Sequence, residues 1–392
     1  MKKFLLAVFL ISNVISSQEI INDTLQTTRQ DLDEVIVKGI RAKFSSPISF
    51  TNVDKQDLKS KNLGQDLPIL LNFLPSVVTT SDAGAGIGYT GIRIRGVSPQ
   101  STNITINGIP FNDPESMGTF WVNLPDFSSS IESLQVQRGV GTSTNGSGAF
   151  GASINILTDI ISDQPFAELS SSFGSYNTLK NTIKFSTGKI NDHFELSGRL
   201  SKIDSDGYID RAYSDLKSYF IQGAYTNGST LIKAISFGGH EKTYQAWYGL
   251  SMDQVEENRR QNPYTYENEI DNYKQDHFQL HWNEKINNHW SFNLGLNYTD
   301  GRGYFEQYKE DDDINTYGGI VKSDIDSNGQ ETGTTDLIRR RWLDNDFYVL
   351  NSSINYIKDK IDLTLSSSYS SYVGDHYGCL LYTSPSPRDK SS

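Results

Sequence analysis

The chain has 392 residues, a formal net charge of -12 at pH 7 and 11% aromatic residues. This length suggests two domains or one large one. The acidic balance, with no run of lysines and arginines, argues against nucleic acid as a partner, because phosphate binding needs a concentrated basic face. With Cys379 as its single cysteine, the chain has no intramolecular disulfide.

The first 17 residues have the order of a secretory signal. Lys2 and Lys3 precede the apolar run 4–11, and small polar residues follow up to Ser17. The run is too short to cross a bilayer as a helix. We therefore expect residues 1–17 to be a signal peptide and the mature protein to begin near Gln18, with a buried N-terminal element as the less favoured alternative.

Residues 18–43 are polar apart from one apolar island, 32–37. The β-branched residues of this island favour an extended strand, yet little core surrounds them. Such a segment is suited to joining the sheet edge of another protein through main-chain hydrogen bonds. The alternative is that the island is the first strand of the domain that follows.

Two short helices are predicted next. Asp54 can cap a helix that runs towards Ser60, and Asp66 can cap a second one at 67–71. Pro68 is tolerated in the first turn of that second helix, and Pro75 ends it. The leucines of the second helix share one face and are expected in a core.

Residues 90–157 contain four short strand patterns between glycine-rich turns, centred on Ile92/Ile94, Ile104/Ile106, Leu134/Val136 and Ile154/Ile156. Asn107-Gly108 is a hairpin signal. The loop 112–121 combines acidic and aromatic side chains, a composition typical of a recognition loop. A role for Trp121 as a core anchor is an equal alternative.

From Phe166 onwards the pattern changes to long strands of period two. In 193–204, 291–298 and 361–369, apolar residues alternate with polar ones over lengths that suit membrane-barrel strands. Short turns at 189–192, 227–228, 287–288 and 359–360 alternate with longer connections at 205–214, 244–274 and 306–345. This asymmetry is typical of outer-membrane barrels, which have short periplasmic turns and long outer loops.

These motifs together resemble those of a TonB-dependent outer-membrane receptor of the kind common in Bacteroidota. The resemblance runs over the mature chain to about Gly378. It is carried by a segment like a TonB box, which is the partner-binding peptide of the family, and by four plug motifs. The box is Asp33, Glu34, Val35, Ile36 and Val37, and the plug motifs are 92–97, 106–110, 131–139 and 148–156.

The resemblance implies a membrane β-barrel of 22 strands in the complete protein, with an N-terminal α/β plug domain inside its lumen. We assign 18–43 to the periplasmic segment with the box, 44–160 to the plug and 164–378 to about nine barrel strands. Nine strands would close to a diameter of roughly 18 Å, which is too narrow for a plug of roughly 35 Å. The last residues, 379–392, lack the alternation, and we expect them to be a non-native tail.

The resemblance also implies a function and partners. The receptor would take up a scarce ligand across the outer membrane of a Gram-negative bacterium, with energy relayed by TonB together with ExbB and ExbD. A ferric siderophore is the expected ligand, and haem, cobalamin or an oligosaccharide are alternatives. An exported, non-transporting adhesin or glycan-binding protein is the competing class.

The same resemblance suggests which residues carry these roles. The box binds TonB, and the family's plug charges pair with each other or with the barrel. Arg93, Arg95, Glu132 and Arg138 are the candidates for these ion pairs. The candidate ligand contacts are Tyr89, Asn112, Asp113, Glu115, Phe120 and Trp121.

No catalytic motif, cofactor site or metal site is predicted. Asp324 to Gly329 matches the first half of a calcium loop, but Thr335 stands where a bidentate glutamate is needed, so a solvated loop is favoured over calcium. His277 and His281 would lie roughly 13 Å apart on a strand and could not share a zinc ion. The chain is expected to perform no covalent chemistry.

Overall fold

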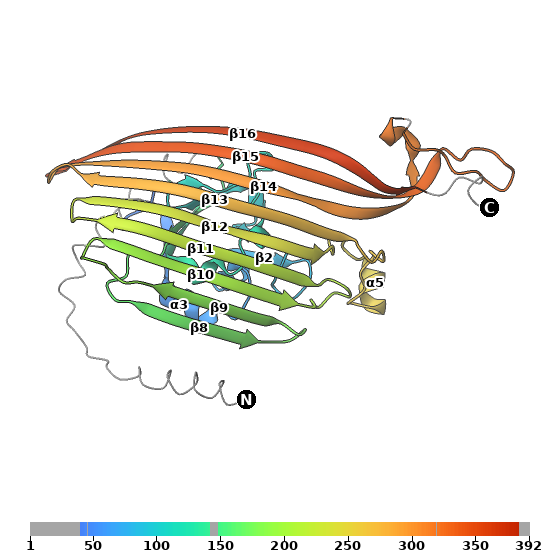
Figure 1. Ribbon diagram of the computed structural model, residues 1–392, viewed down its shortest axis with the longest axis horizontal. Helices are drawn as coiled ribbons and strands as arrows, with labels where there is room; N and C mark the ends of the chain where they lie inside the picture. The colour runs from blue at the N-terminus through green and yellow to red at the C-terminus, as the bar shows by residue number, and fades with distance from the viewer. Residues whose placement is uncertain (1–39, 45, 142–147, 319, 384–392) are drawn as a thin grey trace, which may run out of the picture.

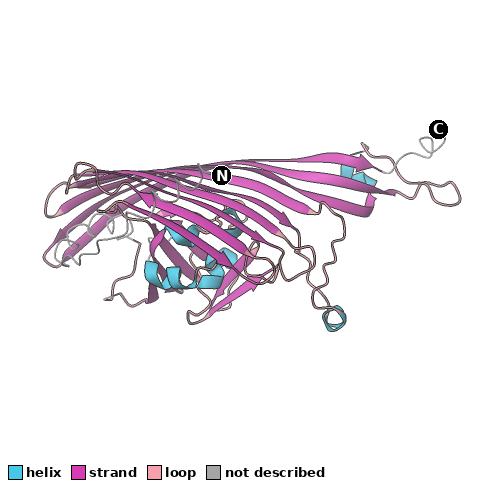
Figure 2. Cartoon of the chain, turned by 60° about the horizontal axis from the view of Figure 1, so that its bottom comes forward, coloured by secondary structure: helices cyan, strands magenta, loops and turns pink. Residues whose placement is uncertain are grey.

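The computed structural model describes residues 40–383, except for 45, 142–147 and 319. Two parts are visible in Figure 1: a sheet of long strands, and a smaller unit that lies against it. Figure 2 shows the helices and short strands of this unit on the concave side of the sheet. The predicted signal peptide, the segment 33–37 and the end of the predicted tail lie outside the described residues.

The smaller unit contains a five-stranded sheet in the order β1-β6-β7-β4-β5 and a separate β2-β3 pair. β4 and β7 pair in parallel, and the other pairs are antiparallel. The four predicted strand patterns correspond to β3, β4, β6 and β7. The bounds are β1 Ser49–Asp54, β2 Val77–Ser81, β3 Thr90–Ile94, β4 Thr102–Ile106, β5 Ile109–Pro110, β6 Ile131–Arg138 and β7 Ala152–Thr158.

The Asn107-Gly108 hairpin forms as predicted. It joins β4 to β5, and Ile106 pairs with Ile109 across it. Asn107 and Gly108 have φ values of 53° and 78°, the left-handed conformation that a tight hairpin of this kind requires at both central residues. The chain can therefore reverse within two residues and continue into the loop that follows β5.

Two short helices lie where the capping residues predict them. α3 (Lys55–Lys61) begins after Asp54, whose Oδ1 accepts a hydrogen bond of 2.9 Å from the N–H of Asp57. α4 (Leu67–Leu70) begins after Asp66, but the Asp66 side chain makes no capping bond. Its Oδ2 instead accepts a hydrogen bond of 2.9 Å from Thr90, so it links α4 to β3.

The described residues also contain four 3-10 helices: η1 Pro99–Ser101, η2 Trp121–Asn123, η3 Phe127–Ser130 and η5 Ile314–Tyr317. Leucines of α4 pack with isoleucines of β3, β4, β6 and β7 in one core. Phe220, Ile235 and Phe237, which come from the long strands, belong to the same core. The smaller unit and the long sheet are thus joined by a continuous apolar interior.

Nine antiparallel strands form the long sheet, each paired with its neighbours in chain order from β8 to β16. This agrees with the expectation of about nine barrel strands. The bounds are β8 Phe166–Phe173, β9 Leu179–Ser186, β10 Phe194–Ser205, β11 Ser214–Thr226, β12 Thr230–Tyr244, β13 Ile270–Lys285, β14 Trp290–Asp313, β15 Thr334–Lys358 and β16 Ile361–Thr383. We call this sheet the wall and the smaller unit the plug.

Period-two alternation separates the two faces of the wall, as β10 shows. Phe194, Leu196 and Leu200 are 52%, 47% and 58% exposed, whereas Glu195 and Arg199 between them are buried at 4% and 1%. Apolar side chains therefore point outward and polar ones point towards the plug, which is the arrangement expected of barrel strands in lipid. Among the described residues, no helix is long and apolar enough to cross a membrane.

Short turns and long connections lie at opposite ends of the wall. The turns after β9, β11, β13 and β15 are short, and the helix α5 (Met252–Glu257) lies in the long connection between β12 and β13. In Figure 1, α5 marks the end that carries the long connections. We call this the long-loop end and the other the short-turn end.

One predicted connection is shorter than expected. The sequence suggested a loop over 306–345, but β14 extends to Asp313 and β15 begins at Thr334. Residues 302–309 pair with 337–344 in continuous register. Charged residues on both strands here obscure the apolar alternation. β16 likewise continues past Gly378 to Thr383.

Candidate functional site

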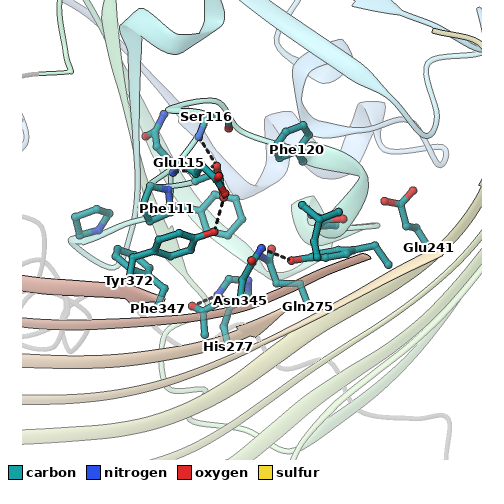
Figure 3. A pocket seen from close by; sticks show the side chains of 18 of the residues that line it. Phe111, Glu115, Ser116, Phe120, Glu241, Gln275, His277, Asn345, Phe347 and Tyr372 are labelled. Atoms are coloured by element: carbon teal, nitrogen blue, oxygen red, sulfur yellow. Dashed lines mark hydrogen bonds between the residues drawn. The ribbon is translucent and has the colours of Figure 1, made fainter. Parts of the chain in front are cut away.

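A cavity of about 560 Å³ lies between the plug and the wall. Its plug side is formed by Tyr89 and by the loop that follows β5, and its wall side by inward residues of β12 to β16 and by Trp247. Figure 3 shows Glu115 and Tyr372 facing one another across it. The aromatic lining residues are Tyr89, Phe111, Phe120, Trp247, Tyr273, Phe305, Phe347 and Tyr372.

Two polar residues fix the shape of the plug loop. The Oδ1 of Asn112 accepts a 2.7 Å hydrogen bond from the N–H of Ile104, and its Nδ2 donates to the carbonyl oxygens of Thr102 and Met117. Asp113 accepts from the N–H of Ser116 at 2.6 Å. Together they anchor the loop to β4 and hold its turn.

The loop then reaches the wall through Glu115. Its Oε2 accepts a hydrogen bond of 3.0 Å from the hydroxyl of Tyr372 and lies 2.8 Å from Nε2 of His376. Both wall residues are on β16, so Glu115 connects the plug to the last described strand. All three side chains are partly accessible, so this contact is open to solvent.

Tyr89 makes a second connection across the cavity. Its hydroxyl donates to a carboxylate oxygen of Asp271 on β13 and lies 3.5 Å from Glu241 on β12. Its ring packs edge-on against Trp247 at 5.4 Å between centroids. Burial, reinforced by the two carboxylates, raises the pKa of Tyr89 well above its usual value, so the hydroxyl keeps its proton.

The structure brings five of the six predicted ligand contacts together. Tyr89, Asn112, Asp113, Glu115 and Phe120 all line the cavity. Trp121 lies instead in the shared core, where it is 3% exposed. The assignment of the five lining residues as ligand contacts stays a prediction.

The wall half of the cavity was not predicted. Glu241, Asp271, Tyr273 and His277 occupy inward positions on β12 and β13, and Phe347 lies on β15. The sequence does indicate that these residues lie on the polar face of alternating strands. The alternation alone does not show which of the inward residues contact the plug loop. Phe347 points into the cavity (Figure 3).

The predicted plug charges are not brought together as one set. Glu132 pairs with Lys55 at 3.0 Å. Arg138 donates hydrogen bonds to the hydroxyls of Thr51 and Ser49. Within the part of the chain that the structure describes, Arg93, Arg95 and Arg138 form no ion pair. Their place in the family's plug charges stays a prediction.

The buried ion pairs that join plug and wall use other residues. Asp126, at the start of η3, lies 2.7 Å from Lys180 of β9 and 3.4 Å from Arg199 of β10. Burial alone would raise the pKa of Asp126, but Arg199 and Lys180 outweigh it and hold the pKa below its usual range. Asp126 therefore stays ionised between two cations of the wall.

Asp159 forms a second buried contact of this kind. It lies 2.6 Å from Lys184 of β9 and 2.8 Å from Lys55 of α3. Burial opposes its ionisation, yet these two lysines lower the pKa of Asp159 below the usual value. The plug is thus fastened by buried charges on the side that faces β9 and β10.

A second cavity, of about 590 Å³, lies beyond the plug loop. It shares Ile109, Asn112 and Asp113 with the first, but its wall residues lie further towards the short-turn end. They include His281, Asn293, Asn351 and a series of serines on β16. Ile40, in the segment that precedes the plug, also lines this cavity. The Asn107-Gly108 hairpin and the following loop therefore separate two cavities along the inner face of the wall.

No group of three or more histidine, cysteine, aspartate or glutamate side chains in the described residues could hold a metal ion. His277 and His281 lie on β13, as the strand interpretation assumed. Nothing in this part of the chain provides a built metal centre next to the cavity.

The comparisons with known proteins agree with this architecture. The sequence model of the TonB-dependent Receptor Plug Domain family matches residues 42–153. The vitamin B12 transporter BtuB of Vibrio vulnificus is 28% identical over 214 residues, which are 53% of this chain and 33% of that protein. The ferrienterobactin receptor of Escherichia coli is 24% identical over 193 residues, 45% of this chain and 26% of the receptor.

Solved structures show the same fold. The ferric preacinetobactin receptor BauA of Acinetobacter baumannii superposes with a TM-score of 0.64 at 11% identity, over 86% of this chain and 49% of that one. The ferric-catecholate import receptor Fiu of E. coli, in its open form, superposes with a TM-score of 0.62 at 15% identity. The match covers 85% of this chain and 50% of that one. The chain thus spans about a quarter to a third of the length of the curated relatives that it matches and about half the length of these structures.

The described chain consists of a plug that packs against the inner face of a nine-stranded antiparallel wall, with a cavity between them. Residues 42–153 match the plug-domain family of TonB-dependent receptors, and the plug with its nine wall strands shares the fold of solved receptors of this class. Receptors of this class lie in the outer membrane of Gram-negative bacteria, and these similarities place the chain there as well.

Proposed function

We propose that the protein takes up a scarce ligand across the outer membrane with energy supplied through TonB, ExbB and ExbD. A ferric siderophore is the first class of ligand to consider, and relatives whose names refer to ferric enterobactin, other siderophores and vitamin B12 support a role of this kind. The proposal requires no covalent chemistry and no catalytic residue.

The observation that carries this proposal is the position of the two cavities. The first lies between plug and wall and is lined by residues towards the long-loop end. The second lies on the other side of the plug loop and is lined by Ile40, three residues after the predicted TonB-binding segment. A ligand held in the first cavity would thus be separated from the TonB side by a loop of the plug.

The segment 33–37 is the proposed handle for TonB. Its β-branched residues suit pairing with a strand of a partner. Energy transferred to this segment would act on the plug near the second cavity, since Ile40, three residues further along the chain, lines that cavity. The plug assignment to 44–160 and the wall assignment from 164 onwards are part of this proposal.

Deletion of residues 33–37 tests it. In Gram-negative cells that express the receptor and TonB, we expect energised uptake of the ligand to disappear while binding at the cell surface persists. Deletion of the neighbouring residues 26–30, also five in number, is the matched control and should leave uptake in place. Unchanged uptake after removal of 33–37 would reject TonB coupling and favour a non-transporting binding protein.

A further inference from the structure

We propose that the first cavity selects a ligand of zero or positive net charge, such as a ferric trihydroxamate with a pendant ammonium group, and rejects a polyanionic ferric catecholate. The inference rests on the proposed uptake function and names the class of ligand that the cavity takes.

The cavity has a one-sided set of ionisable groups. Five carboxylates line it, and the described lining residues include no lysine and no arginine. Three carboxylates belong to the plug and two to the wall. They are Asp82, Asp113, Glu115, Glu241 and Asp271.

Four of these five carboxylates have no cationic partner nearby among the described residues. Glu115 lies beside His376, and in the described part of the chain the other four form no ion pair with a lysine, arginine or histidine. Glu241 and Asp271 are instead bridged by the neutral hydroxyl of Tyr89. Asp82 and Glu115 are exposed, and Asp113 is half-buried, so the plug side offers its charge to whatever enters.

The second cavity shows that this charge is local. It is lined mainly by asparagine, serine and threonine, and Asp113, which both cavities share, is its single carboxylate among the described lining residues. The carboxylates are therefore concentrated on the long-loop side of the plug. There they would attract or repel a ligand as it first approaches, because a cleft lined by charges of one sign focuses the electrostatic field.

The rest of the lining suits an organic cation. Phe111, Phe120, Trp247 and Phe305 present aromatic rings to the same space as the carboxylates. Aromatic faces attract ammonium groups, and their edges and faces pack against apolar parts of a ligand. A cavity of about 560 Å³ falls within the usual range for small-molecule sites.

The charge of the metal complex decides between the ligand classes. Three hydroxamates carry one negative charge each and cancel the charge of Fe³⁺, whereas three doubly charged catecholates leave the complex strongly anionic. Carboxylates that lack cationic partners repel such an anion and attract an ammonium group. We expect the order of affinity to be cationic trihydroxamate, neutral trihydroxamate and then tris-catecholate, with at least about a tenfold difference between the first and the last.

Equilibrium dialysis of the chain in neutral detergent tests this order directly. Three radioactive iron complexes serve as probes: a trihydroxamate with a pendant ammonium group, the same trihydroxamate with that amine acetylated, and a tris-catecholate. The expected preference should shrink in high salt, because exposed charges are screened. Preferential binding of the tris-catecholate, equal binding of the cationic and acetylated probes, or binding of none would overturn the proposal.

Charge-neutralising variants assign the effect to the cavity. Asp82→Asn combined with Glu115→Gln should weaken binding of the cationic probe by about tenfold and change binding of the acetylated probe by less than about twofold. Asp253→Asn with Glu256→Gln removes the same charge from the exposed surface of α5 and is the matched control. Equal effects of the two double variants would reject the cavity as the origin of the selectivity.

This dialysis needs no TonB, so its result is separate from the test of uptake. A preference for the tris-catecholate would reject the ligand class and leave energised uptake intact. Selective binding of the cationic probe together with uptake that does not depend on residues 33–37 would reject the proposed function and leave the ligand class intact.

Discussion

Asp126 of the plug lies 2.7 Å from the ammonium group of Lys180 on β9, and their side chains are 0% and 2% exposed. Arg199 of β10 approaches the same carboxylate at 3.4 Å, and the hydroxyls of Thr182 and Ser201 donate to it. One plug carboxylate is therefore enclosed by donors from two wall strands. This relationship fixes where the plug sits on the wall.

We predict that Asp126→Asn destabilises the protein by about 3–5 kcal/mol, because it leaves Lys180 and Arg199 buried without a counter-charge. Denaturant unfolding in detergent measures this change. Glu168→Gln is the control: it breaks the exposed Lys59–Glu168 pair and should cost less than about 1 kcal/mol. Similar losses in the two variants would contradict the structural role of the buried pair.

Gly239 on β12 makes room for the plug. A Cβ at this position would overlap the carbonyl oxygen of Asn123 and the ring of Pro125. We expect Gly239→Val to prevent the plug from seating on the wall, which limited proteolysis of the detergent-solubilised chain would reveal as faster cleavage within the plug. Gly223→Val on β11, where a Cβ meets no atom within 4 Å, should keep the cleavage pattern of the parent protein.

Asp66 makes the stability of the plug dependent on pH. Burial raises its pKa from 3.8 to about 8, although the hydrogen bonds from Thr90 and from the N–H of Gly88 act in the opposite direction. Between these two values the folded protein keeps a proton that the unfolded chain releases. The stabilising contribution is complete below pH 3.8 and is lost as the pH rises through about 8.

The free energy of unfolding therefore falls with rising pH, and Asp66 contributes to this slope by at most about 1.4 kcal/mol per pH unit. We predict that Asp66→Asn removes this contribution. Free energies of unfolding at pH 5 and pH 8 provide the measurement. The parent protein should lose more stability between the two values than the variant does. Asp253→Asn, on the exposed surface of α5, should behave like the parent protein, and a slope in Asp66→Asn equal to that of the parent would disprove the assignment.

Local signals predicted much of the fold. Capping by Asp54 placed α3, the Asn107-Gly108 pair placed the β4–β5 hairpin, and period-two alternation placed β10 with its apolar face outward. Each of these features depends on residues close together in the chain. The extension of β14 and β15 past the expected ends was missed because their pairing in this region does not require apolar alternation.

Contacts between distant segments could not be predicted in the same way. Asp126 and Lys180 are separated by two strands of the plug and the first strand of the wall. The alternation of the strands does predict that three wall cations face inward: Lys180, Lys184 and Arg199. Their plug partners, Asp126 and Asp159, depend on how the plug is turned within the wall, and no local pattern specifies that orientation.

The plug is held unequally, and this has a mechanical consequence. Towards β9 and β10 it is fastened by buried ion pairs, whereas the Asn107-Gly108 hairpin is held on the other side by neutral hydrogen bonds to Gln279 and Asn351. A tensile load on the N-terminal end would break the weaker attachments first. Displacement of the hairpin alone would connect the first and second cavities, while the rest of the plug stayed anchored.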